Sequence, residues 1–217
     1  MALAAALVAA IAFARITEDY LTNDPLARWD VTFARWLAER RTTAGVDFFR
    51  TMTWVGSPAT AVVVGAVACA FLYRRRRVVD AGLIVLVVGG AELLNTTLKL
   101  AFHRQRPEVA FVHLDTYSYP SGHAMMATAF YGALAYLLCR RLSGFWASVG
   151  VVAAAILLVV VIGFSRLYLG EHYLADVLSG YAGGAFWLAV SIALALAYGE
   201  QLRRRFEGSR ADALARL

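Results

Sequence analysis

Long apolar runs alternate with short polar segments along most of this chain. A short apolar run covers residues 2–14, and five longer ones fall near residues 54–73, 78–98, 124–139, 146–164 and 174–198. A helix of about 20 residues spans a hydrocarbon core of about 30 Å. The pattern therefore predicts an all-α integral membrane bundle of six helices. The first helix is short for a span, so we expect that it is tilted against its neighbours or that sequence before it is missing. A cleaved signal peptide is the alternative, but no basic region precedes residue 2.

The segment 17–50, between the first two runs, has a different pattern. Asp24 followed by Pro25 is typical of a helix start, and apolar residues then recur with helical spacing at Trp29, Phe33, Trp36 and Leu37. This spacing predicts an amphipathic helix. Its tryptophans suit the headgroup region, so we expect it to lie flat on the outer membrane surface. The alternative is a helix that packs on the bundle as a structural cover.

Composition supports a membrane protein. The chain has 217 residues, of which 60% are hydrophobic, and its mean hydropathy is +0.61, whereas an ordinary soluble domain is about 45–50% apolar. We find no internal repeat, low-complexity tract or linker, so we predict one domain over residues 1–217. Cys69 and Cys139 lie inside predicted spans, which argues against a disulfide framework or exposed thiols.

The positive charges are concentrated beside the predicted spans. Arginine blocks occur at Arg74 to Arg77, Arg140-Arg141 and Arg203 to Arg205. By the positive-inside rule these blocks are cytoplasmic, as is the N-terminus of a six-span chain. The net charge of +6 is then mainly a topology signal, and we predict no nucleic-acid partner because no binding module surrounds the basic residues. The loops after the third and fifth spans then face the opposite side.

The first of three polar clusters lies in the loop after the third span. Lys99 ends that span, and Arg106 follows seven residues later. Arg offers a rigid fork to phosphate oxygens and Lys offers a point charge, so the two could hold one anion just outside the hydrocarbon. Alternatively, each side chain extends to the lipid headgroups.

The second cluster opens the fourth span. Ser121, Gly122 and His123 follow Pro120 at the predicted helix start. Unpaired N–H groups and the positive end of the helix dipole suit an anion there, and Gly permits close approach. His123 could protonate a leaving oxygen. The alternative is a turn that merely starts a helix.

The third cluster joins the fifth and sixth spans. Arg166 follows one span, while His172 and Asp176 open the next. On a helix their i, i+4 spacing would put imidazole and carboxylate on one face, where the carboxylate orients the ring as a nucleophile. Two histidines with Asp176 could instead bind zinc, but the surrounding cations would repel a metal ion.

Together the clusters form the pattern Lys99-x6-Arg106-Pro107, Pro120-Ser121-Gly122-His123 and Ser165-Arg166-x5-His172-x3-Asp176. This resembles the three-part signature of the type 2 phosphatidic acid phosphatase (PAP2) superfamily of membrane lipid phosphatases. The match holds in order, in spacing and in position between spans, over residues 92–180. The first ninety residues match the family only in general layout.

The resemblance implies a role for each matched residue. His172 would attack phosphorus and become a phosphohistidine, Asp176 would support it, and His123 would protonate the leaving lipid oxygen. The phosphoryl oxygens would be held by Lys99, Arg106, Ser121, Gly122 and Arg166. No metal and no cofactor are implied.

The sequence therefore predicts a multi-pass cell-membrane phosphatase with its active site on the extracytoplasmic side. Its partners would be membrane lipids and a lipid phosphate: phosphatidylglycerol phosphate, phosphatidic acid, diacylglycerol pyrophosphate or undecaprenyl pyrophosphate. The alternatives are a lipid phosphotransferase that uses the same histidine, and a non-catalytic lipid carrier or channel. The sequence makes no prediction about oligomeric state.

Several polar residues near the clusters lie outside the signature. Glu92 and Asn95 share one side of the third span with Lys99, and we expect Glu92 to face the bundle interior as a structural partner. The others are expected to be loop or interface residues, which could tune substrate choice: His103, Arg104, His113, Tyr168 and Glu171.

Overall fold

The regular elements in the described part of the chain are all α-helices, so the predicted all-α class is confirmed there. The computed structural model describes residues 1–22, 25–112 and 115–214. Its helices are α1 (Ala2–Thr22), α2 (Pro25–Ala38), α3 (Thr43–Val55), α4 (Pro58–Arg74), α5 (Val78–Phe102), α6 (Gly122–Cys139), α7 (Phe145–Tyr168) and α8 (Leu174–Leu214).

Within the described residues, four helices are long and apolar enough to cross a membrane: α5, α6, α7 and α8 as far as Gln201. The pair α3 and α4 makes a fifth candidate if it is one span bent by 44°. Helix α1 runs to Thr22, well beyond the predicted residue 14, and packs along α8. The prediction of six spans stays a prediction.

The second predicted span, residues 54–73, is interrupted near its start. Helix α3 ends at Val55 and α4 begins at Pro58. Proline lacks the N–H that a continuing helix would need, and the Ser57 side chain accepts a hydrogen bond from the Thr60 N–H at 3.1 Å as the cap of the new helix. The predicted run is therefore divided between the end of α3 and α4, because local capping at Ser57 starts a second helix.

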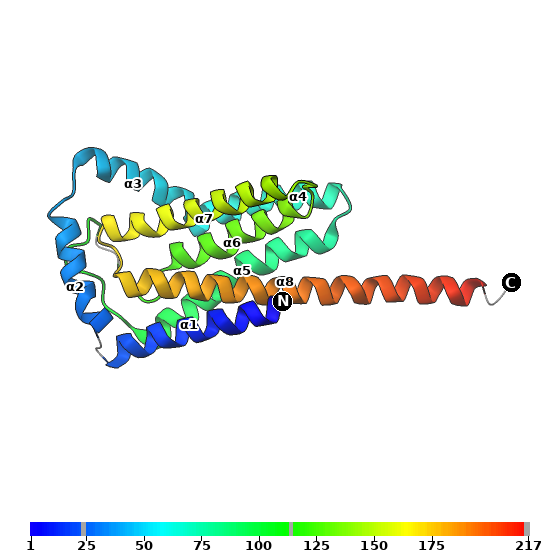
Figure 1. The fold of residues 1–217 in the computed structure, drawn as a ribbon, viewed down its shortest axis with the longest axis horizontal. Coiled ribbons are helices and arrows are strands. Elements are labelled where there is room, and N and C mark those ends of the chain that lie inside the picture. Colours follow the sequence, from blue (N-terminus) through cyan, green and yellow to red (C-terminus); the bar gives the residue numbers. More distant parts are fainter. Residues whose placement is uncertain (23–24, 113–114, 215–217) are drawn as a thin grey trace.

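The amphipathic helix is present as α2, which lies across one end of the bundle (Figure 1). Its expected cap, Asp24, lies outside the described residues. Trp29 is 64% exposed, while Ala34 and Leu37 are buried, so α2 has one apolar face against the bundle and one facing outward. Its location at a membrane surface stays a prediction.

The helices pack closely beneath α2. Phe130, Met126 and Ile84 are almost fully buried between α5 and α6. Helix α8 approaches α6 at Gly180, where an added Cβ would lie 2.6 Å from the Ser121 carbonyl oxygen. This close approach brings the start of α8 beside the start of α6, next to the loop that joins α5 to α6 at the left-hand end of the bundle (Figure 1).

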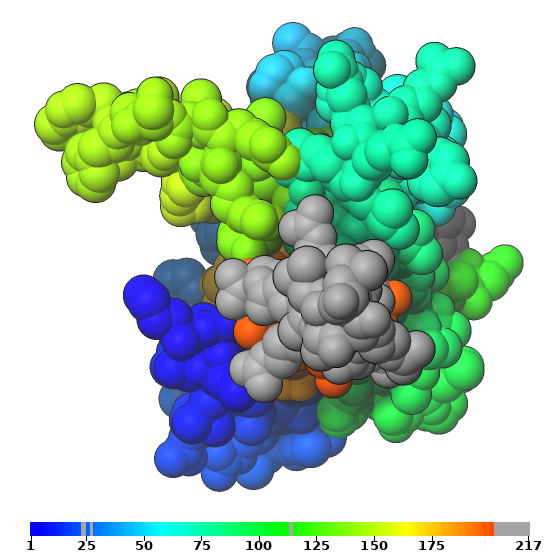
Figure 2. Space-filling model, turned by 90° about the vertical axis from the view of Figure 1, so that its right-hand side faces the viewer, coloured from blue at the N-terminus to red at the C-terminus, as the bar shows by residue number. Residues whose placement is uncertain are grey.

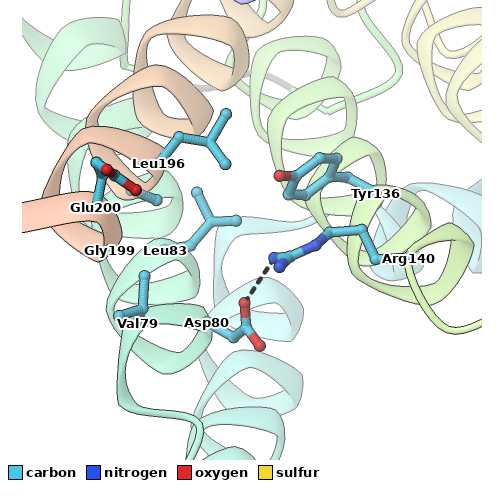
Figure 3. A pocket seen from close by; sticks show the side chains of 9 residues that line it. Val79, Asp80, Leu83, Tyr136, Arg140, Leu196, Gly199 and Glu200 are labelled. Carbon is cyan, nitrogen blue, oxygen red and sulfur yellow. Dashed lines mark hydrogen bonds and ion pairs between the residues drawn. The ribbon is translucent and has the colours of Figure 1, made fainter. Parts of the chain in front are cut away.

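The opposite end of the bundle carries the arginine turns. Figure 2 shows this end, with the α4–α5 turn in blue-green and the α6–α7 turn in yellow-green. Asp80 of α5 pairs with Arg77 at 2.6 Å and with Arg140 at 3.1 Å, which ties α5 to α6. A cavity of about 390 Å³ lies beside this pair and is also lined by Tyr136 and Leu196 (Figure 3). The arginine turns and the three polar clusters therefore lie at opposite ends of the bundle.

Candidate active site

Two cations, one at the end of α5 and one in the loop that follows it, fix the loop from α5 to α6. Lys99, in the last turn of α5, donates to the Tyr117 carbonyl and lies 3.4 Å from the Ser118 carbonyl. Arg106 donates to the Thr116 carbonyl at 2.8 Å and to the Glu171 carbonyl at 2.7 Å. Both cations are thus fixed beside the start of α8, as a phosphate site requires.

The start of α6 faces the same place. The Ser121 N–H donates to the Asp176 carbonyl at 2.8 Å, and its hydroxyl is buried with no hydrogen-bond partner in the described part of the chain. Gly122 is packed against α5, since an added Cβ would lie 2.8 Å from the Asn95 amide nitrogen. A free hydroxyl and the open N–H groups of a helix start are available donors for an anion.

Arg166 enters from the end of α7 and is nearly fully buried. One guanidinium nitrogen donates to the Thr53 hydroxyl, and another is ion-paired with Glu171. Nε of Arg166 has no hydrogen-bond partner among the described residues. Glu171, expected as a loop or interface residue, therefore holds one of the candidate phosphate-binding cations.

His172 lies before α8 rather than on it, because that helix begins at Leu174. The prediction that His172 and Asp176 share one helical face is wrong in its geometry. The predicted contact is nevertheless present, since Nδ1 of His172 lies 3.4 Å from Oδ2 of Asp176. Nε2 of the same ring lies 3.4 Å from Nη1 of Arg106. His172 is only 2% exposed, so it is a buried side chain rather than one at an open helix mouth.

Burial and neighbouring cations fix the charge state of His172. Desolvation lowers the pKa of His172 well below its usual 6.5, and Arg106, Arg166 and Lys99 lower it further. At neutral pH the ring is therefore neutral. With the proton on Nδ1 beside Asp176, Nε2 carries the lone pair that a nucleophile needs.

His123 belongs to the same cluster. It lies in the first turn of α6 and is close enough to interact electrostatically with the cations and with His172. The fold therefore brings all of the predicted site residues to one end of the bundle: Lys99, Arg106, Ser121, Gly122, His123, Arg166, His172 and Asp176.

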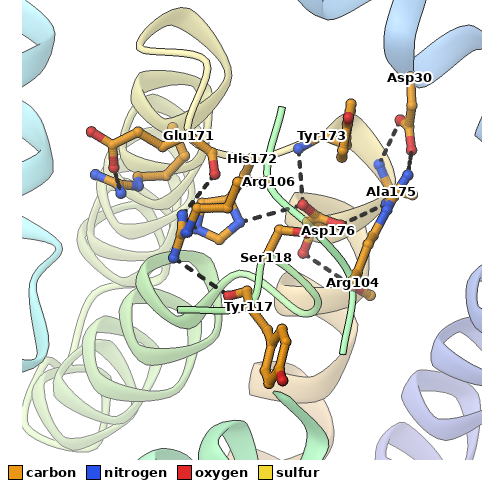
Figure 4. A network of polar contacts seen from close by, with 12 residues as sticks. Asp30, Arg104, Arg106, Tyr117, Ser118, Glu171, His172, Tyr173, Ala175 and Asp176 are labelled. Carbon is orange, nitrogen blue, oxygen red and sulfur yellow. Dashed lines mark hydrogen bonds and ion pairs between the residues drawn. The ribbon is translucent and has the colours of Figure 1, made fainter. Parts of the chain in front are cut away.

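The structure adds Arg104 to the site and pairs it with an aspartate of α2 that lies outside the site. Arg104 donates to Asp176 at 2.6 Å and to Asp30 of α2 at 2.8 Å (Figure 4). Burial raises the pKa of Asp30, although Arg104 opposes this effect. A signal was present in the sequence, because Asp30 shares the inward face of α2 with Ala34 and Leu37, where a charge needs a partner.

The predictions for the other polar residues near the site are confirmed in some cases and wrong in others. Glu92 is exposed, so its expected position facing the bundle interior is wrong, whereas Asn95 is buried. The physical reason is that residues three apart on a helix point about 60° away from each other, so Glu92 falls outside the buried face of α5 that holds Asn95. His103 caps α5 in the left-handed conformation, and the Tyr168 hydroxyl accepts from the Thr42 N–H at 2.9 Å. His113 lies outside the described residues.

This arrangement suits phosphoryl transfer. A neutral imidazole with a carboxylate on one nitrogen can attack phosphorus, fixed cations can neutralise the equatorial oxygens, and a second imidazole can supply a proton.

Comparison with known proteins agrees with this chemistry. The family model described as the PAP2 superfamily matches residues 80–199. Phosphatidylglycerophosphatase B of Bacillus subtilis is 40% identical over 127 residues, which is 57% of this chain and 60% of that protein. Lipid A 1-phosphatase of Rhizobium johnstonii is 34% identical over 116 residues, 48% of this chain and 43% of that protein. The chain thus matches about two fifths to three fifths of the length of these relatives.

Two solved structures share the fold. The transmembrane PAP2-type phosphatidylglycerolphosphate phosphatase from Bacillus subtilis aligns with a TM-score of 0.75 and 27% identity, covering 92% of this chain and 96% of that one. The structure of LpxE from Aquifex aeolicus aligns with a TM-score of 0.61 and 22% identity, covering 76% of this chain and 95% of that one. The second match is a likeness of fold alone.

Proposed function

The chain belongs to the PAP2 superfamily, and from this premise we propose that it is a membrane lipid phosphatase that works through a phosphohistidine. The observation that carries the proposal is the position of His172. One ring nitrogen faces the Asp176 carboxylate and the other faces Arg106, inside a cluster that also contains Lys99 and Arg166. A neutral, oriented nucleophile among cations is what attack on a phosphate dianion requires.

In the proposed first step, Nε2 of His172 forms a bond to phosphorus while the bond from phosphorus to the lipid oxygen breaks. The bound phosphate dianion favours a protonated His123 ring, which gives its proton to that oxygen, and Asp176 stabilises the charge that develops on the His172 ring. Lys99, Arg106 and Arg166, with Ser121 and the Gly122 N–H, hold the three equatorial oxygens. Water then attacks phosphorus and gives a proton back to His123, the bond to Nε2 breaks, and phosphate leaves.

For the substrate we propose a lipid phosphate monoester or pyrophosphate, in the classes expected from the sequence. The printed names of two relatives, a phosphatidylglycerophosphatase and a lipid A phosphatase, support a lipid substrate. The depth of the site also supports it, because Lys99, His123 and Arg166 all lie at the ends of span-length helices. A phosphate attached to lipid tails is held at that depth.

We expect long-chain lipid phosphates to show kcat/KM at least about 100 times that of glycerol phosphate, because remote apolar binding positions the reacting group. The measurement is phosphate release by the purified full chain from a panel of lipid phosphates in mixed micelles. Equal efficiency on glycerol phosphate would contradict a site that takes its substrate from the bilayer. No release from any lipid would favour a carrier, and loss of lipid phosphate without free phosphate would favour a phosphotransferase.

Activity is expected to survive EDTA, because the cations that would neutralise the transition state are side chains of the protein. Vanadate should inhibit, because it takes up the five-coordinate geometry of phosphorus that those cations stabilise. The measurement is the initial rate of phosphate release after dialysis against EDTA, with and without added Zn²⁺ or Mg²⁺. Loss of rate that either metal restores would indicate a metal enzyme.

We also propose that the site faces outward from the cytoplasm, in a single domain of six spans with α2 at the membrane surface. The arginine turns at the opposite end support this orientation. In a chain without Cys69 and Cys139, an impermeant maleimide applied to whole cells is expected to label a cysteine at position 108 but not one at position 76. The reverse labelling would place the chemistry in the cytoplasm.

A further inference from the structure

Arg104 is buried between two carboxylates that come from distant parts of the chain. Its Nη1 donates to Oδ1 of Asp176 at 2.6 Å, and its Nη2 donates to Oδ2 of Asp30 at 2.8 Å (Figure 4). The Arg104 side chain is 10% exposed, and both aspartate side chains are fully buried. Because a guanidinium is a planar fork with fixed donor directions, these two contacts fix both carboxylates relative to each other.

Two aromatic rings hold the guanidinium in place. Its central carbon lies 4.6 Å from the centroid of Tyr20, in α1, and 4.3 Å from the centroid of Tyr173. A cation is attracted to the face of an aromatic ring, most strongly where water is excluded. Arg104 is therefore confined by ring contacts as well as by its two hydrogen-bonded partners.

Each carboxylate oxygen of Asp176 has its own contacts in this arrangement. Oδ1 accepts from Arg104, while Oδ2 accepts from the Tyr173 N–H at 2.9 Å and faces Nδ1 of His172 at 3.4 Å. Removal of Arg104 would leave Oδ1 without its charged donor, in a place that water does not reach. The carboxylate would then be free to turn toward other donors, and Oδ2 would lose its fixed direction toward His172.

We propose that Arg104 is a positioning residue for phosphoryl transfer: it holds Asp176 so that Oδ2 keeps the His172 ring with Nε2 toward phosphorus. The proposal rests on the proposed function of the site. We assign Arg104 no contact with phosphate, because each of its terminal nitrogens already donates to an aspartate. Its contribution is made in the step in which His172 attacks.

The competing explanation is a purely structural one. Asp30 also accepts from the Ala175 N–H at 3.0 Å, so the Asp30–Arg104 pair fastens α2 to the start of α8. Of the two members of that pair, however, it is Arg104 that donates to Asp176. Arg104→Gln and Asp30→Asn therefore form a matched pair: each breaks the ion pair to α2, but only the first removes the charged donor from Asp176.

Arg104→Gln is expected to lower kcat about 10- to 100-fold and to change KM by less than about twofold. Loss of an orienting carboxylate lowers kcat about 10⁴-fold, and loss of the residue that holds this carboxylate should lower kcat by a smaller factor. Asp30→Asn is expected to lower kcat by less than about threefold. The rate of phosphohistidine formation in a single turnover should fall by the same factor as kcat. Thermal unfolding of each variant serves as the control for folding.

Equal losses of kcat in the two variants would overturn the proposal and leave Arg104 a structural role. A raised KM at unchanged kcat would also overturn it, since that result would indicate substrate binding. Arg104→Gln leaves two carboxylates without a charged partner, which can prevent folding. In that case the double variant Arg104→Gln/Asp30→Asn, which keeps only one such carboxylate, is compared with Asp30→Asn alone.

A measurement that needs no activity separates this proposal from the proposed function. The ¹⁵N shifts of His172 report which ring nitrogen carries the proton. The Nδ1–H tautomer is expected in the wild type and in Asp30→Asn, and a mixture of tautomers in Arg104→Gln. The same single tautomer in all three would overturn the positioning role, whether or not any lipid phosphate is hydrolysed; an inactive wild type would contradict only the proposed function.

Discussion

Replacement of His172 by glutamine is expected to lower kcat on a lipid phosphate by at least about 1,000-fold, which corresponds to about 4 kcal/mol of transition-state stabilisation. The reason is that the variant loses the atom that would form the bond to phosphorus, and with it the covalent step. Glutamine is preferable to alanine here because His172 is buried, so truncation would also leave a cavity beside Arg106. The measurement is phosphate release under saturating substrate, together with trapping of a labelled phosphoenzyme.

The matched control is His103→Asn. His103 caps α5 in the left-handed conformation, which asparagine also adopts readily, and it is not among the proposed site residues. This variant should keep its rate within about twofold and should still form the labelled phosphoenzyme. Retention of more than about a hundredth of the wild-type rate in His172→Gln would rule out His172 as the nucleophile.

Replacement of His123 by glutamine is expected to lower kcat about 100- to 10,000-fold on a lipid phosphate, because the alkoxide of the leaving lipid needs a proton in the transition state. The loss should depend on the leaving group. An aryl phosphate, whose phenolate leaves without a proton, should lose less than about tenfold in the same variant. The measurement is the ratio of the two rates in the wild type and in His123→Gln.

His172→Gln provides the contrast for this experiment, since loss of the nucleophile should slow both substrates equally. A loss in His123→Gln that is the same for lipid and aryl phosphates would show that His123 does not act as the acid for the leaving group. The distinction matters because both histidines lie among the same cations. Their proposed roles differ in the atom that each one reacts with: His172 attacks phosphorus, and His123 protonates the leaving oxygen.

The sequence alone identified the candidate site residues and much of the helical framework. Apolar runs are long enough to identify a span without knowledge of their neighbours, since the length of a run is a local property. The predicted runs 78–98, 124–139 and 146–164 lie within α5, α6 and α7. The candidate residues were identified from local spacing in the same way. Their convergence at one end of the bundle was predictable because an odd number of crossings separates them from the arginine turns.

Tertiary structure decided how those residues are held. The contact from Arg104 to Asp30 joins residues 74 positions apart, and no local pattern specifies that partner. The exposure of Glu92 depends on how α5 rotates against its neighbours, and the burial of His172 depends on how the segment before α8 packs between other helices. Side-chain pairing, rotation of helices and the orientation of a carboxylate are set by packing between distant segments, so only the folded chain determines them.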